Sequence, residues 1–360
     1  MINVTKAYLP DQEQYIKYVR EIWDRGYLTN NGPLVQELEA KLKEYLNVDY
    51  LYFCGNGTIV LQIAMKALGI KGEVITTPFS YVATSNVILW ENCLPVFVDI
   101  DPETFNINPD LIEASITSET TAILATHVYG NPCDVEKIEA IAKKHNLKVI
   151  YDGAHAFGVT YKGKSLFSYG DLSTCSFHAT KVFHTTEGGA LISNHPELDK
   201  ELHLLRAFGH KGDEEYYFAG INGKNSEFHA AMGLCNLPNV PDIIAARKEI
   251  FDWYDGFLNW DILSKPKISS DIEYNYAYYP VVFPSEQILR KVQAALAAED
   301  IIPRRYFYPS LNTLAYMPKN IPCPVSEDVS VRVLSLPLYV GLPLSDVERI
   351  SKIINDHISP

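Results

Sequence analysis

Short, nearly continuous apolar runs alternate with longer segments that carry apolar residues at helical spacing through the first two thirds of the chain. Runs of this kind are typical of buried strands, and the periodic segments are typical of amphipathic helices. The runs predict strands at residues 51–54, 73–77, 94–100, 122–129, 147–152 and 172–177. The periodic segments predict helices at residues 11–25, 35–46, 59–68, 134–145, 198–206 and 225–236, with a further helix opening in residues 78–84.

Buried strands separated by helices predict an α/β fold, in which a mostly parallel sheet is covered by helices on both faces. The pattern changes near residue 240, where a helix at 243–258 leads to a strand at 277–283 and helices at 286–298 and 345–357. We therefore expect a large α/β domain over residues 1–239, including the N-terminal helix. A smaller C-terminal α+β domain is expected over residues 240–360.

The overall charge restricts the partners of the protein. The 360-residue chain has a formal net charge of −13, so its field repels phosphate and argues against non-specific binding to nucleic acid or membranes. An anionic ligand would therefore need a local basic or amide-lined pocket. The six cysteines have no paired spacing, which predicts reduced core residues in a cytoplasmic protein and no metal site. Residues 1–15 lack the apolar core of a signal peptide, and no apolar run approaches membrane-spanning length.

A glycine-rich turn follows the first predicted strand. Residues 55–58 (Gly-Asn-Gly-Thr) stand between that strand and the helix at 59–68. Such a turn leaves backbone N–H groups free at the positive end of a helix, where anions bind, but it is also an ordinary turn with Thr58 as the helix cap. A second, amide-rich turn at residues 30–33 is either a plain connector or part of a polar ligand site.

An aspartate and a lysine follow two of the predicted strands. Asp152 ends one strand and is followed by His155, and Lys181 comes shortly after the strand at 172–177. The carboxyl ends of parallel strands share one edge of a sheet, and ligands bind at that edge. A lone lysine is usually a surface residue. A lysine with a strand-borne aspartate and a histidine, however, is the set that a pyridoxal phosphate (PLP) enzyme requires, because the lysine forms a Schiff base and the aspartate keeps the pyridinium nitrogen protonated.

Further motifs extend this pattern almost from end to end of the chain. They lie at residues 57–58, 78–84, 152–158, 176–189, 220–222, 305, 308–309 and 336–338. With these motifs, the chain resembles the DegT/StrS family of PLP-dependent sugar-nucleotide aminotransferases. The resemblance implies a PLP fold-type I aminotransferase with a mixed, mostly parallel seven-stranded sheet, helices on both faces and a smaller C-terminal α+β domain.

The resemblance also implies roles at the cofactor. Lys181 would bind PLP as a Schiff base and move the proton during transfer, and Asp152 would pair with the pyridine nitrogen. His155 stands where many relatives have a glutamine that bonds the phenolic oxygen of the cofactor. The other implied contacts are ring stacking by Tyr81, phosphate binding by Gly57, Thr58, the N–H group of Ile59 and Ser176, and a phosphate contact from a neighbouring subunit by Asn222. The contact from Asn222 implies a homodimer with shared active sites.

The implied reaction moves the amino group of L-glutamate, through PLP, to a nucleotide-linked keto-sugar without a metal ion. Lys224 stands where an arginine is common, so a bidentate contact is lost there. Arg305 is best placed to offset the negative charge of the chain at a diphosphate. The candidate substrate-binding residues are Asn30, Asn31, His184, Lys224, Arg305, Tyr306 and Tyr308.

Residues 28–33 and 178–183 resemble a subgroup that converts dTDP-4-keto-6-deoxyglucose to dTDP-4-amino-4,6-dideoxyglucose, for surface polysaccharides such as the lipopolysaccharide O-antigen. Three alternatives stay open: the same chemistry at C3 of a dTDP-3-keto-6-deoxyhexose, a PLP sugar dehydratase, and a non-catalytic regulator. Lys181 favours amino transfer, because relatives that dehydrate can carry a histidine in its place. Lys181 together with Asp152 argues against a regulator, because a binding shell need not keep both residues.

Overall fold

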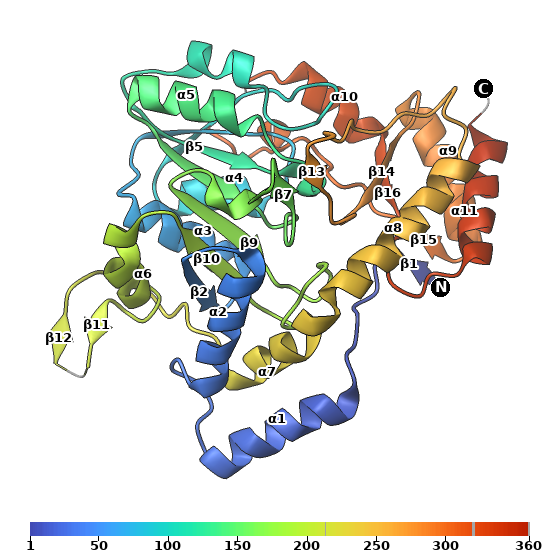
Figure 1. Cartoon of the computed structure of the whole chain (residues 1–360). Coiled ribbons are helices and arrows are strands. Elements are labelled where there is room, and N and C mark those ends of the chain that lie inside the picture. Colours follow the sequence, from blue (N-terminus) through green and yellow to red (C-terminus); the bar gives the residue numbers. More distant parts are fainter. Residues whose placement is uncertain (213, 319–320, 359–360) are drawn as a thin grey trace.

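The computed structural model describes residues 1–212, 214–318 and 321–358, and Figure 1 shows their arrangement. The largest sheet contains seven strands in the order β2 (Tyr50–Cys54), β10 (Gly189–Ser193), β9 (Leu172–Ser176), β6 (Lys148–Asp152), β5 (Thr120–Thr126), β3 (Glu73–Thr76) and β4 (Leu94–Phe97). Strand β10 is antiparallel to β2 and β9, and the other pairs are parallel. The prediction of a mixed, mostly parallel seven-stranded sheet is therefore confirmed.

Helices cover both faces of this sheet. Alternate residues of β2 belong to different apolar clusters, with Tyr52 on one face and Phe53 on the other. The first cluster also contains Val60 of α3 (Gly57–Ala67), together with residues of α4 (Ala83–Trp90) and α6 (Asp199–Leu205). The second contains Leu38 of α2 (Pro33–Leu46), together with residues of α5 (Val135–His145) and α7 (Glu227–Asn236). The period-two alternation of the strands thus fixes which helices share a face.

A second apolar core lies in the C-terminal part of the chain. It joins α8 (Val240–Phe257), α9 (Glu286–Ala298) and α11 (Leu344–His357) to the antiparallel pair β14 (Tyr279–Val282) and β16 (Val333–Leu336). Ile2 belongs to the same core, because β1 (Ile2–Asn3) pairs in parallel with β15 (Ile301–Ile302). A division of the chain at residue 240 stays a prediction, but the first residues pack with the C-terminal unit rather than with the large sheet.

Some elements differ from the apolar pattern. Helix α4 begins at Ala83, later than expected, because the Pro78 carbonyl accepts the Leu311 N–H group at 2.8 Å and the Thr77 hydroxyl accepts the Phe79 N–H group at 3.2 Å. Strands of two residues are too short for a periodic signal. The elements not yet named are α1 (Gln12–Arg25), α10 (Pro324–Arg332), β7 (Thr160–Tyr161), β8 (Lys164–Ser165), β11 (His210–Lys211), β12 (Glu215–Tyr216) and β13 (Ile272–Glu273).

The carboxyl edge of the sheet gathers polar side chains. In register, Thr126 at the end of β5 lies beside Asp152 at the end of β6, and Asp152 lies beside Thr174 of β9. Because β6 and β9 are neighbours, the segments that follow them emerge at the same edge. The fold therefore brings Asp152 and Lys181 to one place, as the strand ends predict.

A buried carboxylate shapes the amide-rich turn at residues 30–33. Glu227, which is fully buried, accepts the N–H groups of Leu34 and Val35 in the first turn of α2, each at 3.0 Å. A Cβ atom on Gly32 would lie 2.6 Å from the carboxyl carbon of Glu227, so glycine is required for this close approach. The turn thus packs around the Glu227 carboxylate, which caps the N-terminus of α2 and links α2 to α7.

We expect Glu227→Gln to destabilise the protein by about 2 kcal/mol, because one buried acceptor oxygen is replaced by an NH₂ group that faces helix N–H donors. Urea unfolding of the apoenzyme measures the change. Glu37→Gln is the matched control: Glu37 lies on α2 in an exposed pair with Lys41, whose loss costs less than about 0.5 kcal/mol. Equal effects of the two substitutions would contradict the role of the cap.

Candidate active site

A cavity of about 570 Å³ opens at the carboxyl edge of the large sheet. Its walls come from the turn after β2, the turn after β3, the end of β6, the segment between β9 and β10, the first residues of the chain and the C-terminal unit. The predicted residues that line it are Gly57, Thr58, Tyr81, Asp152, His155, Ser176, Lys181 and Tyr306.

Lys181 lies in the segment between β9 and β10, and its ammonium group is 3.2 Å from the hydroxyl of Tyr278. Burial acts to lower the pKa of Lys181, but Tyr278 and the charge of Asp152 outweigh it and raise that pKa above its usual value. Tyr278 directly precedes β14 of the C-terminal unit, so the lysine amine is bonded by a residue from outside the large sheet.

Asp152 is buried, with 5% of its surface exposed. Its Oδ2 atom accepts the hydroxyl of Thr84 at 2.7 Å, and its Oδ1 atom accepts the Ala154 N–H group at 3.0 Å. Burial raises the pKa of Asp152, whereas these two hydrogen bonds and the charge of Lys181 act to lower it. A cationic ring nitrogen placed in the cavity would favour the ionised carboxylate further.

A hydrogen bond to His155 determines which of its two ring nitrogens carries the proton. The Tyr129 N–H group donates to Nδ1 of His155 at 3.2 Å, so the neutral ring carries its proton on Nε2. Burial, followed by the charge of Lys181, holds the pKa of His155 well below its usual value, which keeps the ring neutral. The ring lies nearly parallel to that of Phe307, with centroids 5.5 Å apart. A neutral Nε2–H group can donate to a phenolic oxygen, as a glutamine amide would.

The glycine turn forms the end of the cavity near α3. A Cβ atom on Gly57 would lie 2.9 Å from that of Ser176, so this approach requires glycine. Asn56, rather than Thr58, caps α3: its side-chain oxygen accepts the N–H groups of Thr58 at 3.0 Å and Ile59 at 2.8 Å. An anion that used these N–H groups would have to replace the Asn56 oxygen, and Ile59 does not line the cavity.

The two adjacent arginines of the C-terminal unit face opposite ways. Arg304 lines the cavity, with its guanidinium 5.6 Å from the centre of the Tyr306 ring. Arg305 packs away from the cavity: its side chain is 7% exposed, bonds the Val331 carbonyl at 2.8 Å and stacks on Tyr308 at 3.6 Å. The structure therefore places Arg304, which the sequence analysis did not single out, on the cavity wall and Arg305 outside it, and the substrate contact of Arg305 stays a prediction.

His184 has a structural position in this subunit. It is 3% exposed, its Nε2 lies 2.6 Å from the Tyr8 carbonyl, and its Nδ1 accepts the Thr186 N–H group at 3.2 Å. Both ring nitrogens are therefore used to hold backbone, and the residue does not line the cavity. This placement gives no support to the predicted contact between His184 and the substrate.

Three other predicted residues line a second cavity of about 470 Å³. Asn30, Asn31 and Lys224 lie there, and Asn31 accepts a hydrogen bond from the buried Arg206 at 3.2 Å. Asn222 is exposed, and its side-chain oxygen accepts the Lys224 ammonium at 2.7 Å. Asn222 therefore does not reach the cavity that contains Lys181 in its own subunit.

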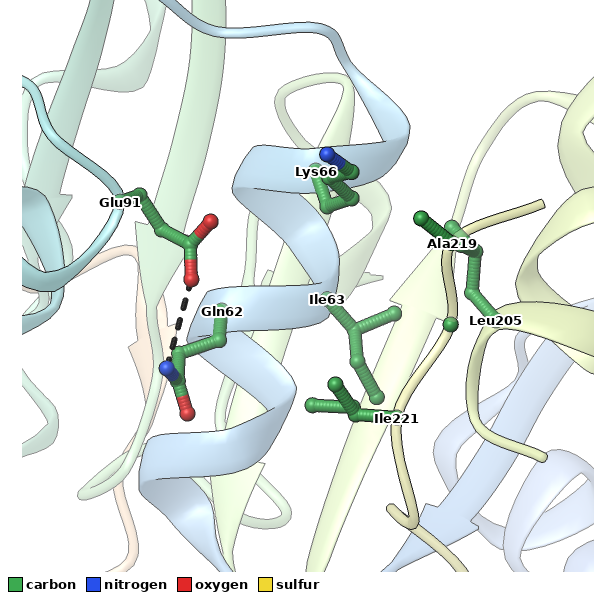
Figure 2. A pocket seen from close by; sticks show the side chains of 8 residues that line it. Gln62, Ile63, Lys66, Glu91, Leu205, Ala219 and Ile221 are labelled. Carbon is green, nitrogen blue, oxygen red and sulfur yellow. Dashed lines mark hydrogen bonds between the residues drawn. The ribbon is translucent and has the colours of Figure 1, made fainter. Parts of the chain in front are cut away.

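The segment that carries Asn222 rests on α3. Figure 2 shows a smaller cavity, of about 150 Å³, where Ile63 of α3 faces Ile221 and where Gln62 bonds Glu91 at 3.3 Å. The same helix borders the Lys181 cavity at its first turn. Helix α3 thus supports both the glycine turn and the segment that presents Asn222 to the outside.

Besides Arg304, the sequence prediction missed Tyr278 and Thr84 at the site. Tyr278 lies in the predicted strand at 277–283, where a run of tyrosines hides which ring faces a ligand. Thr84 lies in the predicted helix opening, and its contact with Asp152 depends on the turn that precedes α4. The residues that the structure describes contain no cluster of His, Cys, Asp and Glu fit to hold a metal ion. Among them, no helix is both long and apolar enough to cross a membrane.

The residues of the cavity fit PLP. A lysine amine, a buried carboxylate and a hydroxyl-bearing glycine turn are the three groups that the aldehyde, the ring nitrogen and the phosphate of this cofactor need. Lys181, Asp152 and the Gly57–Thr58 turn with Ser176 supply them around one volume. His155 adds a donor on the same wall as Asp152.

Comparisons with known proteins agree with this fit. The model of the DegT/DnrJ/EryC1/StrS aminotransferase family matches residues 10–355. A dTDP-4-amino-4,6-dideoxy-D-glucose transaminase of Shigella dysenteriae is 43% identical, over 99% of this chain and 98% of that protein. A GDP-perosamine synthase of Escherichia coli O157:H7 is 35% identical, over 95% of each chain. A solved structure of DesI in the presence of its TDP-sugar product is 30% identical with a TM-score of 0.93, and the match covers 98% of this chain and 92% of that chain. The chain therefore belongs to the DegT/DnrJ/EryC1/StrS aminotransferase family and is a PLP-dependent sugar-nucleotide aminotransferase.

Proposed function

We propose that the enzyme transfers the amino group of L-glutamate to dTDP-4-keto-6-deoxyglucose and forms dTDP-4-amino-4,6-dideoxyglucose for a surface polysaccharide such as the lipopolysaccharide O-antigen. The observation that carries this proposal is the 43% identity to the Shigella transaminase over nearly the whole chain. A GDP-linked keto-sugar is the second candidate, because the GDP-perosamine synthase is also similar over most of its length. The six cysteines are buried and unpaired, which supports a cytoplasmic location.

Different residues of the cavity would act on different atoms of the cofactor. PLP, when bound, supplies an aldehyde that reacts with amines and a ring that accepts electrons from the substrate carbon. Lys181 would hold the aldehyde carbon and then move a proton between that carbon and the substrate, with Tyr278 orienting its amine. Asp152 would bind the ring nitrogen, and the Nε2–H group of His155 would bind the phenolic oxygen.

Arg304 is the group we assign to the anionic part of the substrates. Both L-glutamate and a nucleotide sugar are anions, and the chain as a whole repels them. Among the described residues that line the cavity, the other lysine or arginine is Lys181, which the cofactor would use. Arg304 takes part in no ion pair within the described residues, so its charge is available to a carboxylate or a diphosphate.

A homodimer is the assembly we propose. The hairpin β11–β12 projects from the subunit in Figure 1, and helix α1 packs on α7 through the buried Ile22 at the edge of the subunit. Their exposed apolar side chains include Trp23 (69% exposed) and Tyr216 (71% exposed), a pattern typical of a surface that a partner covers. Since Asn222 is exposed and does not line the cavity of its own subunit, contact with the cofactor phosphate of a second copy would give it a function.

Incubation with L-glutamate and each keto-sugar is expected to give an amino group at C4 of the dTDP-linked substrate, identified by NMR of the product. L-Glutamate alone should reduce the visible absorbance of the bound cofactor. Lys181→Ala should abolish turnover, whereas Lys164→Ala, an exposed lysine on β8, should leave it unchanged. Amination at C3, release of water and ammonia, or an absorbance that glutamate does not change would each contradict the proposal.

Arg304→Ala is expected to raise KM for both anionic substrates by about tenfold, because a charge-assisted hydrogen bond is lost. The matched variant is Arg305→Ala, which should leave KM within about twofold but lower stability by roughly 1–2 kcal/mol through lost packing. Initial rates and urea unfolding measure the two effects. The opposite pattern, with KM raised only in the Arg305 variant, would reverse the assignment.

Mixed dimers test the contact of Asn222 across the interface. Lys181→Ala and Asn222→Ala subunits are each expected to have low activity alone. A hybrid of the two should recover one intact site, because the Asn222→Ala subunit keeps its own lysine and receives Asn222 from its partner. Activity measured on the purified hybrid gives the answer. Activity no higher than that of the Asn222→Ala parent would place Asn222 outside the partner's site.

A further inference from the structure

Behind Asp152 runs a chain of three buried hydroxyl groups. The Thr126 hydroxyl lies 3.1 Å from that of Ser80, the Ser80 hydroxyl lies 2.8 Å from that of Thr84, and the Thr84 hydroxyl lies 2.7 Å from Oδ2 of Asp152. Thr126 and Thr84 are fully buried and Ser80 is 2% exposed. These residues come from the end of β5, the turn after β3 and the start of α4.

The hydrogen bonds along this row of hydroxyl groups all run in one direction, from donor to acceptor. An ionised carboxylate only accepts, so the single hydroxyl hydrogen of Thr84 is used at Asp152. The contact between Ser80 and Thr84 must then be donated by Ser80, and Ser80 in turn accepts from Thr126. All three donors point toward the carboxylate, and hydrogen bonds arranged in series strengthen one another in a buried site.

The register of the sheet brings these hydroxyl groups together. Thr126 and Asp152 are paired residues of β5 and β6, so their side chains lie at the same level of the carboxyl edge. The turn after β3 then brings Ser80 and Thr84 over that edge. By contrast, Thr76 at the end of β3 is equally buried but donates to the Leu124 carbonyl at 2.8 Å, outside the chain of hydroxyls.

We propose that Thr84 is a positioning residue for Asp152: with Ser80 and Thr126 behind it, Thr84 holds the carboxylate ionised and turned toward the ring nitrogen of PLP. The inference rests on the assignment of Asp152 to that nitrogen under the proposed function. The titratable groups that face Asp152 are Lys181 and Cys175 from the β9 side and His155 from its own loop. Of these, Lys181 adds a favourable charge, and Thr84 adds the shorter of the two hydrogen bonds to the carboxylate.

The test compares two cofactors on the apoenzyme. One is PLP, and the other is the analogue in which a C–H group replaces the ring nitrogen. Thr84→Val keeps the side-chain shape but removes the hydroxyl, and it should raise the dissociation constant for PLP by about tenfold and that for the analogue by less than about twofold. Thr84→Ser should restore PLP binding, and the matched control Thr76→Val should alter neither constant.

Each outcome decides between defined alternatives. Equal weakening of both cofactors by Thr84→Val would show a structural role, and no weakening would remove Thr84 from the mechanism; either result overturns the inference. Asp152→Asn tests the underlying assignment separately, because it should weaken PLP but not the analogue. If Asp152→Asn does not distinguish the cofactors, the assignment of Asp152 itself fails. In the Asp152→Asn background, Thr84→Val should add no further discrimination.

Discussion

A carboxylate buried at the end of a strand is the constraint on which this active site depends. Removing a charge from water costs several kcal/mol unless hydrogen bonds and an opposite charge compensate. Asp152 obtains this compensation from Thr84, the Ala154 N–H group and Lys181. Each partner comes from a different segment, so the charge of one side chain interacts with α4, the loop after β6 and the segment after β9.

The cavity also depends on contact between the two parts of the chain. The large sheet supplies the groups for the cofactor, but Tyr278 reaches Lys181 and Phe307 lies against the ring of His155 from the C-terminal unit. The first residues of the chain cross to that unit and line the cavity on the way. A change in how the C-terminal unit packs would therefore alter the orientation of Lys181 and His155 before it altered the sheet.

The large sheet and the central pair Lys181 and Asp152 could be predicted from the sequence, because apolar runs define strands and parallel strands end at a common edge. Arg304 could not be separated from Arg305, because in an extended segment a shift of one residue reverses the direction of the side chain. The sequence around His184 would look the same whether its side chain contacted a ligand or, as in this structure, the Tyr8 carbonyl. The contact between Thr84 and Asp152 depends on a turn whose path is set by tertiary hydrogen bonds.

The contrast between residues fixed by the sheet and residues on loops explains how relatives can share a framework and differ in substrate. The cofactor side of the cavity is formed by strand ends whose register is fixed by a packed sheet, so its geometry tolerates little change. Arg304 and Tyr306, to which we assign the substrate in our proposal, line the cavity from segments outside the large sheet, and loops of this kind can vary without disturbing that register. Adjacent carbons of a sugar ring are one bond length apart. If the anionic group is anchored at Arg304 as proposed, a small displacement of that anchor is sufficient to bring a different ring carbon to Lys181, and selectivity for the ring carbon then depends on where the anion is held.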